Sequence, residues 1–193
     1  MNCCLLTGLV GGVDEAGRGP LAGPVVSSCV IWKNLPEDKK GVTDSKLLTE
    51  KERTALFSWI IGSAFMVGVG TASHEEIDSM NILQASLLSM ERAIAATGVN
   101  PELILIDGNQ NLKNCSQSKT IVKGDRKCFY IASASIVAKV MRDRIMSNYH
   151  FLYPEYNFRK HKGYPTKDHE VAIVQYGVSP IHRRTFHGVK EYC

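Results

Sequence analysis

A short stretch rich in glycine and proline near the N-terminus constrains the fold of this chain most strongly. Residues 9–14 and 25–32, which flank it, are rich in apolar and β-branched residues and predict two strands. The connection between them is too short for a crossover helix, so we expect the two strands to pair antiparallel. Its three glycines and two prolines fix a tight backbone path. We therefore place this connection at the rim of a sheet.

Two neighbouring carboxylates, Asp14 and Glu15, precede the residues Gly17, Arg18 and Gly19 in this connection. Paired acids suit a metal site, and glycines let a phosphate or a sugar approach the backbone closely. A charged hairpin turn is the simpler interpretation of the same residues. Side chains on a regular strand point alternately to opposite faces, so both acids can face one site only if the strand bends. We therefore predict that the regular strand ends at or just before Glu15.

Strands and helices alternate along the rest of the chain, without an internal repeat or a linker. Capping boxes begin at Thr49 and Ser73, and each is followed by apolar residues at helical spacing. After the antiparallel start, this alternation predicts a single α/β domain over residues 1–193. The expected strands cover residues 9–14, 25–32, 64–70, 103–106 and 120–123. The expected helices start after Thr49, run from Ser73 to about Gly98, cover residues 126–149, and start after Thr166.

The composition is that of an ordinary globular protein. No apolar run approaches the ~20 residues of a membrane-spanning helix, and the N-terminus lacks the basic leader of a signal peptide. Six cysteines form no Cys-x-x-Cys pair and show no zinc-ligand spacing. We interpret them as reduced thiols, in preference to a metal or redox pair at Cys3 and Cys4. These features predict a cytoplasmic monomer that does not enter a membrane.

Charge is divided unevenly between the two halves of the chain. The net charge is −5 over residues 1–110 and +9 over residues 111–193, for a total of +4. The excess of lysine and arginine continues into the tail from about residue 150, which we expect to pack on the rest of the domain. An acidic site that faces a basic surface indicates a polyanionic partner. A dipolar surface without a function remains the alternative.

Four carboxylates fall at or just after the ends of expected strands. Asp14 and Glu15 end the first strand, Asp107 ends the most buried one, and Asp125 follows the last. Taken alone, Asp107 could be a turn residue and Asp125 a helix cap. Gathered at one rim, the four would repel each other unless cations neutralised them. Mg²⁺ or Mn²⁺ suit oxygen ligands of this kind, and two such ions can hydrolyse a phosphodiester without a protein nucleophile.

The residues around these acids belong to longer motifs, of which the first reads Gly-Val-Asp-Glu-Ala-Gly-Arg-Gly-Pro-Leu-Ala-Gly-Pro. The motifs cover residues 12–24, 44–46, 105–108, 123–125, 131–140, 161–164 and 180–184. Together they resemble ribonuclease HII, the type 2 ribonuclease H family, over nearly the whole chain. The related ribonuclease HIII has a lysine in its glycine motif, so Arg18 favours HII.

The resemblance implies an RNase H-like fold, with a five-stranded mixed β-sheet flanked by α-helices. It implies an endoribonuclease that hydrolyses the RNA strand of RNA–DNA hybrids and incises 5′ to single ribonucleotides embedded in duplex DNA. Such a cut leaves 5′-phosphate and 3′-hydroxyl ends. The implied partner is therefore a hybrid or a ribonucleotide-containing duplex. A sliding-clamp partner stays open, and nothing in the sequence indicates one.

By the same resemblance, the four acids Asp14, Glu15, Asp107 and Asp125 are the catalytic carboxylates. They would hold two Mn²⁺ or Mg²⁺ ions in the substrate complex, with direct ligation by Asp125 left open. The alternatives are a non-catalytic hybrid-binding module, which would need a degenerate acid set, and a resolvase or integrase acting on DNA. The complete set of acids argues against the first of these.

Other residues of the resemblance concern the substrate. Gly17, Arg18 and Gly19 match the segment that reads the ribonucleotide 2′-hydroxyl, because missing side chains let backbone groups reach a sugar edge. Tyr164 matches a tyrosine that packs on the sugar at the RNA–DNA junction, and its presence argues against a DNA-specific enzyme. Ser45 and Lys46 resemble phosphate contacts, although Lys46 could be a solvated surface lysine. Arg183 and Arg184 could contact the nucleic-acid backbone or have a structural role at the C-terminus. Packing against the sheet explains Ser133 and Ser135 in the long helix.

Overall fold

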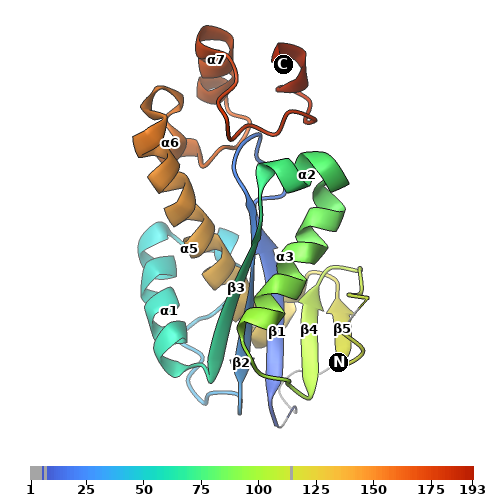
Figure 1. Cartoon of the computed structure of the whole chain (residues 1–193). Helices are drawn as coiled ribbons and strands as arrows, with labels where there is room; N and C mark the ends of the chain where they lie inside the picture. The colour runs from blue at the N-terminus through green and yellow to red at the C-terminus, as the bar shows by residue number, and fades with distance from the viewer. Residues whose placement is uncertain (1–5, 7, 114) are drawn as a thin grey trace.

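The computed structural model, which describes residues 6, 8–113 and 115–193, contains a five-stranded sheet in the order β3-β2-β1-β4-β5 (Figure 1). The first three strands of the chain pair antiparallel, while β4 runs parallel to β1 and β5 parallel to β4. The sheet is therefore mixed, as expected. The strands are β1 (Val10–Ala16), β2 (Val25–Trp32), β3 (Met66–Ala72), β4 (Leu103–Asp107) and β5 (Ser118–Ile121).

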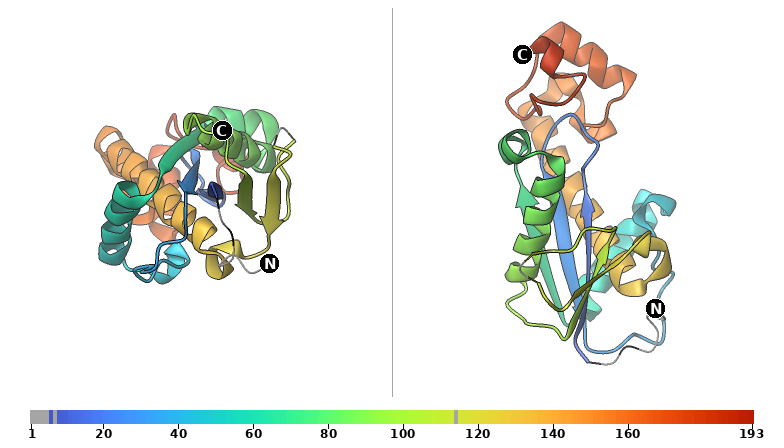
Figure 2. Two further views of the ribbon diagram at one scale, coloured as in Figure 1. Left: turned by 90° about the horizontal axis from the view of Figure 1, so that it is seen from below. Right: turned by 90° about the vertical axis from the view of Figure 1, so that its right-hand side faces the viewer.

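Helices cover both faces of this sheet (Figure 2). The α-helices are α1 (Glu50–Ser63), α2 (His74–Met80), α3 (Ile82–Ala96), α4 (Gly124–Lys127), α5 (Phe129–Leu152), α6 (Phe158–His161) and α7 (Lys167–Tyr176). Short 3₁₀ turns are η2 (Ser45–Leu47), η3 (Pro154–Tyr156) and η4 (Lys190–Tyr192). Both capping boxes are confirmed, because Thr49 and Ser73 each accept a hydrogen bond from the backbone of a glutamate three residues on.

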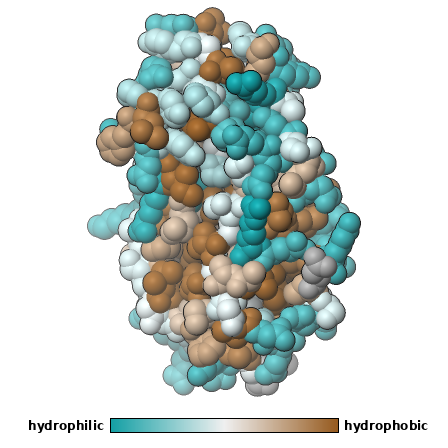
Figure 3. Space-filling model, in the orientation of Figure 1, coloured by the Kyte–Doolittle hydropathy of each residue, from teal (hydrophilic) through white to brown (hydrophobic). Residues whose placement is uncertain are grey.

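The long helix α5 lies on one face of the sheet and α3 on the other. A Cβ at Gly12 in β1 would come within 2.0 Å of the Tyr130 backbone in α5. A Cβ at Gly70 in β3 would come within 2.2 Å of the Ser89 carbonyl in α3. Glycine at these positions lets both helices approach the strands closely. On the face seen in Figure 3, apolar residues gather over the middle of the molecule and polar residues border its ends.

Two expected helices are interrupted in the structure. The helix that starts after Ser73 stops at Met80, because Asn81 takes a φ of 71°. The Asn81 side chain then caps α3 by accepting from the amides of Leu83 and Gln84. The long helix begins at Phe129 instead of residue 126, since Cys128 is extended and separates it from the short α4. Strand ends also shift by one or two residues, and β1 runs two residues beyond the expected range.

The C-terminal residues lie across the end of the sheet, against the connection between β1 and β2 (Figures 1 and 2). Backbone hydrogen bonds join the two segments, from Leu21 N to Gly163 O at 2.8 Å and from Gly23 N to Ile181 O at 2.9 Å. Ala22 and His182 form an isolated antiparallel bridge. The tail therefore fixes the connection that carries the glycines.

Cys3 and Cys4 lie outside the described residues, so their interpretation is not addressed by the structure. Cys29, Cys115 and Cys193 carry free thiols. In the part of the chain that the structure describes, no helix has both the length and the apolar character needed to cross a membrane.

Candidate active site

Asp14 and Asp107 come directly after the last paired residues of two adjacent parallel strands. The register between β1 and β4 ends with Val13 opposite Ile106, so each aspartate follows at the same rim. Asp14 is opposite Ser28 in β2, whose hydroxyl donates to a carbonyl of α5, and the two side chains therefore share the α5 face. The predicted gathering of these two acids at one edge of the sheet is what the structure contains.

The prediction that the regular strand ends at or just before Glu15 is wrong. β1 continues to Ala16, because its ladder with β2 continues, with Glu15 opposite Ser27 and Ala16 opposite Val26. Glu15 nevertheless lies near Asp107, whose charge helps to raise the pKa of the Glu15 carboxyl. Pairing between β1 and β4 has already ended at this level, which leaves room for the Glu15 side chain beside the rim. The acids therefore meet although β1 stays paired with β2 through Ala16.

Burial and mutual repulsion disfavour the charged forms of these acids. Burial, then the charges of Glu15 and Asp107, hold the pKa of Asp14 well above its ordinary value. Burial raises the pKa of Glu15 as well, and Arg18, 3.4 Å from it, partly offsets this. The pKa of Asp125 is raised by burial and by Asp107. An acid cluster with so little compensation suits a cation, which would remove the repulsion.

The donor set of the cluster consists of carboxylate oxygens, which fits hard divalent cations such as Mg²⁺ and Mn²⁺. Three of the acids have partners within the protein: Asp107 accepts from the Gly124 amide at 2.7 Å, Glu15 faces Arg18, and Asp125 lies 4.0 Å from Lys46. Accordingly, among the described residues no three His, Cys, Asp or Glu side chains are grouped as a ready set of metal ligands. The chemistry of the ligands fits, and the side chains would have to converge.

A cavity of about 240 Å³ opens beside the acids. Every residue that the sequence assigns to substrate binding lines it. Tyr164 is partly exposed there, with the Lys139 ammonium 5.9 Å from its ring centroid. Ser45 Oγ lies 3.0 Å from Ser135 Oγ, which connects η2 to α5. The lining residues are Glu15, Ala16, Gly17, Arg18, Gly19, Ser45, Lys46, Ser135, Lys139 and Tyr164.

The glycine turn is held from beneath by the buried guanidinium of Arg142. This group donates to the carbonyls of Pro24 at 3.0 Å, Ala22 at 3.1 Å and Lys162 at 2.9 Å. Gly17 has a φ of 101°, and a Cβ there would stand 2.0 Å from Arg142 Nε. Only glycine meets both requirements. Burial also lowers the pKa of Arg142 to about 10, so the guanidinium stays charged at neutral pH.

Arg183 holds the same turn from the C-terminal tail. It donates to the carbonyls of Gly17 at 2.6 Å, Arg18 at 2.9 Å and Gly23 at 2.9 Å, and its side chain is fully buried. Of the two interpretations left open for Arg183, the structure shows the structural one. The neighbouring Arg184 is exposed, and its backbone amide donates to Asp78.

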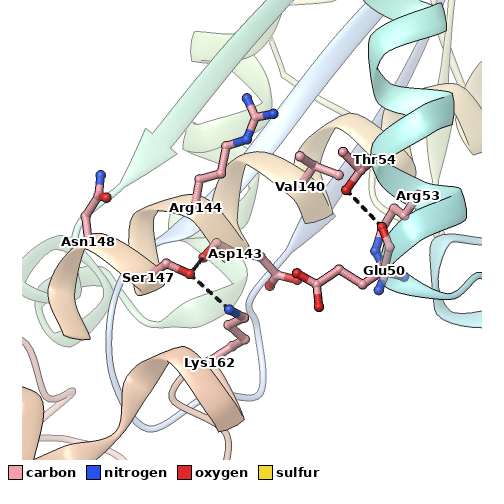
Figure 4. Close-up of a pocket in the computed structure, with 9 residues that line it drawn as sticks. All are labelled: Glu50, Arg53, Thr54, Val140, Asp143, Arg144, Ser147, Asn148 and Lys162. Carbon is pink, nitrogen blue, oxygen red and sulfur yellow. Dashed lines mark hydrogen bonds between the residues drawn. The ribbon is translucent and has the colours of Figure 1, made fainter. Parts of the chain in front are cut away.

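A second cavity, of about 230 Å³, lies between α1, α5 and the turn before Tyr164 (Figure 4). Lys162 points into it and donates from Nζ to Ser147 Oγ at 3.0 Å. The Lys162 carbonyl accepts from Arg142 on the other side of the backbone. Both contacts fasten the turn that carries Tyr164 to the long helix α5.

Three residues of α5 contribute to the site and were missed as functional candidates. Ser135 had been explained by packing, and Lys139 and Arg142 had received no role. Their separations of four and three residues place them on one side of the helix. That spacing, next to a resembling motif at residues 131–140, was the available signal in the sequence. The hydrogen bonds of Arg142 to Pro24 and Ala22 and of Ser135 to Ser45 are long-range and could not be read from the sequence.

Comparisons with known proteins agree with this arrangement. The family model described as Ribonuclease HII matches residues 11–189. A Ribonuclease HII from Wolbachia sp. subsp. Brugia malayi (strain TRS) is 52% identical over 181 residues, which cover 94% of this chain and 89% of that protein.

Solved structures share the fold. The crystal structure of ribonuclease H2 from Pyrococcus horikoshii OT3 is 30% identical, with a TM-score of 0.77 over 95% of this chain and 96% of that one. Bst RNase HIII, solved in complex with Mn²⁺, is 17% identical and shows the same fold, with a TM-score of 0.77 over 97% of this chain and 70% of that one. The expected RNase H-like fold is therefore confirmed, and the chain belongs to the ribonuclease HII family, metal-dependent ribonucleases that act on RNA–DNA hybrids.

Proposed function

We propose that this enzyme incises 5′ to single ribonucleotides embedded in duplex DNA, in addition to cutting the RNA strand of longer hybrids. One observation carries the proposal: Glu15 of the acid cluster and the Gly17–Arg18–Gly19 turn line the same cavity as Tyr164. A phosphodiester held at the acids therefore has its neighbouring sugar at the turn. Hydrolysis at this position would leave a 5′-phosphate and a 3′-hydroxyl.

Asp14, Glu15, Asp107 and Asp125 are the residues that would hold two divalent cations, Mn²⁺ or Mg²⁺. When bound, such a pair supplies an activated water and stabilises the leaving oxygen. The raised pKa values of Asp14, Glu15 and Asp125 support the assignment, because cations would remove the repulsion that raises them. The Mn²⁺ complex of Bst RNase HIII, a protein of the same fold, also supports it.

The substrate residues act by position. Gly17 and Gly19 present backbone without side chains, so a ribose edge with its 2′-hydroxyl can approach them. The Tyr164 ring, which a Cβ at Gly19 would contact at 3.8 Å, offers an apolar surface to the next sugar. Lys46 and Ser45 line the same cavity, and Lys46 Nζ lies 4.0 Å from Asp125 Oδ2, so a phosphate held at the acids would lie beside Lys46.

The whole chain, residues 1–193, is proposed to act as one catalytic domain and as a cytoplasmic monomer. The tail supports this because Arg183 and the backbone around Ile181 hold the glycine turn. The free thiols of Cys29, Cys115 and Cys193 support a reducing compartment.

The direct test uses a labelled duplex that contains one ribonucleotide, incubated with Mg²⁺ and, separately, with Mn²⁺. We expect a single cut on the 5′ side of the ribonucleotide, with product ends that a phosphatase and a 3′-exonuclease identify as 5′-phosphate and 3′-hydroxyl. Asp14→Asn is the control and should bind the duplex without cutting it. Wild-type turnover by Asp14→Asn, or cutting of an all-DNA duplex at a similar rate, would contradict the proposal.

A further inference from the structure

Three histidines, none of which has a role in the proposed chemistry, are buried together beneath Tyr164. His161, His169 and His182 are each less than a tenth exposed, and the rings of His161 and His169 stack with centroids 4.4 Å apart. His169 Nε2 lies 3.0 Å from His182 Nε2. A buried pair of ring nitrogens at this distance has to share one proton.

The ends of this pair fix where its protons lie. The Ser179 amide donates to His182 Nδ1 at 2.8 Å, so this nitrogen is an acceptor and His182 carries its proton on Nε2. His182 therefore donates to His169 Nε2. His169 then carries its own proton on Nδ1, which lies 2.9 Å from the Tyr164 carbonyl oxygen, an acceptor only. The hydrogen bonds run in one direction, from Ser179 through both rings to Tyr164.

The same pair is attached to the glycine turn. His182 bridges Ala22 through the backbone, and the next residue, Arg183, donates to the carbonyls of Gly17 and Arg18. One end of the pair is thus fixed to the turn that is proposed to face the ribose, and the other to Tyr164, which lines the same cavity. A change in the pair would alter the distance between Tyr164 and the turn.

We propose that His182 and His169 are positioning residues that set Tyr164 against the Gly17–Arg18–Gly19 turn. Through this distance, the pair controls how strongly the enzyme prefers a single ribonucleotide over a long hybrid. The inference rests on the role proposed above for Tyr164 at the junction. It adds a physical basis for that role, because Tyr164 is partly exposed and its backbone carbonyl is held by His169.

Their surroundings keep both rings in the neutral form that the relay needs. Burial lowers the pKa of His169 to about 4 and that of His182 to about 3. Besides burial, the nearby rings of His169, His161 and His74 contribute to the lowered pKa of His182. His161 is satisfied separately, accepting from the Gly163 amide and donating to the Tyr156 carbonyl. At working pH the hydrogen bonds therefore keep their direction.

Two substitutions at position 169 separate positioning from packing. His169→Phe keeps a flat ring against Phe158 and His161 and removes both hydrogen bonds. His169→Asn loses the ring, but its amide can still donate to the Tyr164 carbonyl. For each variant, kcat/KM is measured on a single-ribonucleotide duplex and on a long RNA–DNA hybrid, together with Tm. The selectivity ratio is kcat/KM on the single-ribonucleotide duplex divided by kcat/KM on the long hybrid. We expect His169→Phe to lower this ratio about fivefold, which corresponds to the loss of roughly one net hydrogen bond.

The order of the two variants is the informative result. The positioning role predicts that His169→Asn stays within about twofold of the wild-type ratio, even though it has the lower Tm because it leaves a cavity. Tyr156→Phe is the matched control, since it removes a hydrogen bond to the Gly177 carbonyl in the same apolar cluster without touching Tyr164. It should lower Tm and leave the ratio unchanged. A ratio that follows Tm across all three variants would overturn the proposal.

Tyr164→Ala distinguishes a failure of this inference from a failure of the proposed function. If Tyr164→Ala lowers the ratio and His169→Phe does not, the relay is wrong and the role of Tyr164 stands. If Tyr164→Ala leaves the ratio unchanged, the junction role itself is wrong and the inference fails with it. Nitrogen-15 NMR of the imidazole rings tests the relay without any substrate. It should find His182 protonated on Nε2 and His169 on Nδ1, and the opposite tautomers would refute it.

Discussion

Arg183 Nη2 lies 2.6 Å from the carbonyl oxygen of Gly17, although 166 residues separate the two in sequence. A guanidinium from the C-terminal tail thus holds the turn that directly follows the two acids of β1. Its other two hydrogen bonds go to Arg18 and Gly23 in the same connection. Arg183 therefore shapes the part of the site that is proposed to read the sugar.

Arg183→Lys should destabilise the protein and weaken substrate discrimination together. A lysine keeps the positive charge but cannot serve three carbonyls in a fixed plane, so buried acceptors lose their donors. We expect the free energy of unfolding to fall by about 3 kcal/mol, measured by urea denaturation. Arg184→Ala, at an exposed position, is the neighbouring control and should stay within about 0.5 kcal/mol of wild type. Equal effects of the two substitutions would contradict the structural role of Arg183.

Asp14→Asn should abolish cleavage and, in metal-free buffer, increase stability at alkaline pH. The raised pKa of Asp14 means that the folded protein binds this proton more tightly than the unfolded chain does. Wild-type stability is therefore lost as pH rises from the ordinary carboxyl value through the raised pKa. Asparagine carries no such charge, so at pH ~8 the variant should be more stable by about 1 kcal/mol or more. Thermal unfolding with a chelator present measures the stabilities of the variant and the wild type. If the difference in stability between the two proteins were the same at pH ~4 and pH ~8, the prediction would be wrong.

The histidine cluster should make the protein sensitive to acid. The pKa of His169 is lowered from its ordinary 6.5 to about 4, so between these values the unfolded chain binds a proton that the folded chain does not. Stability from this group is thus complete above pH ~6.5 and is lost as pH falls towards 4. In His169→Phe, the free energy of unfolding should decrease with falling pH less steeply than in the wild type, by about 1 kcal/mol per pH unit. His187→Phe, at an exposed histidine, should leave the slope unchanged, and a matching change there would refute the assignment.

Local sequence signals predicted much of this fold. β2 has the bounds expected from its apolar run, because residues buried on both faces leave a continuous pattern. The sequence also predicted where two helices begin, after Thr49 and after Ser73. A capping box is a contact between residues three apart, so it can be recognised in the sequence. Contacts between near neighbours are not all predicted, however, because the break at Asn81, which takes a φ of 71° and caps α3, lies inside one expected helix.

Other errors and omissions come from contacts between distant residues. β1 continues through Glu15 because β2 pairs with it, a condition that strand alternation alone does not include. Arg142 was missed for the same reason, since its hydrogen bond to Pro24 spans 118 residues. The acids were found because strand ends of one sheet converge at a rim. The contacts by which Arg142 and Arg183 hold the turn beside them could be found only from the structure.

Lys139→Met should weaken binding of nucleic acid without altering its sequence or sugar preference. Lys139 lines the cavity next to Tyr164, and its ammonium is paired with Asp143 at 2.7 Å, which holds it in place. If it contacts a phosphate, its loss should reduce the slope of log K against log salt by about 1. Fluorescence anisotropy with a hybrid, in Ca²⁺ to prevent cutting, measures that slope. Lys33→Met, just beyond the far end of β2, is the control and should leave it unchanged; the same slope for both variants would contradict the role of Lys139.

Gly17→Ala tests whether the turn needs glycine for its backbone conformation or also for the guanidinium behind it. A φ of 101° already disfavours alanine, and the added Cβ would stand 2.0 Å from Arg142 Nε. Gly98→Ala is the matched control: Gly98 has a φ of 64°, but a Cβ there meets nothing within 4 Å. Backbone strain alone should cost Gly98→Ala about 1 kcal/mol of stability. Gly17→Ala should lose at least about 2 kcal/mol more, because overpacking displaces Arg142 and the carbonyls that it holds.

Gly17→Ala should also lose incision at single ribonucleotides, measured on the labelled duplex that contains one ribonucleotide. If both variants unfold with equal free energies, Arg142 does not shape the turn.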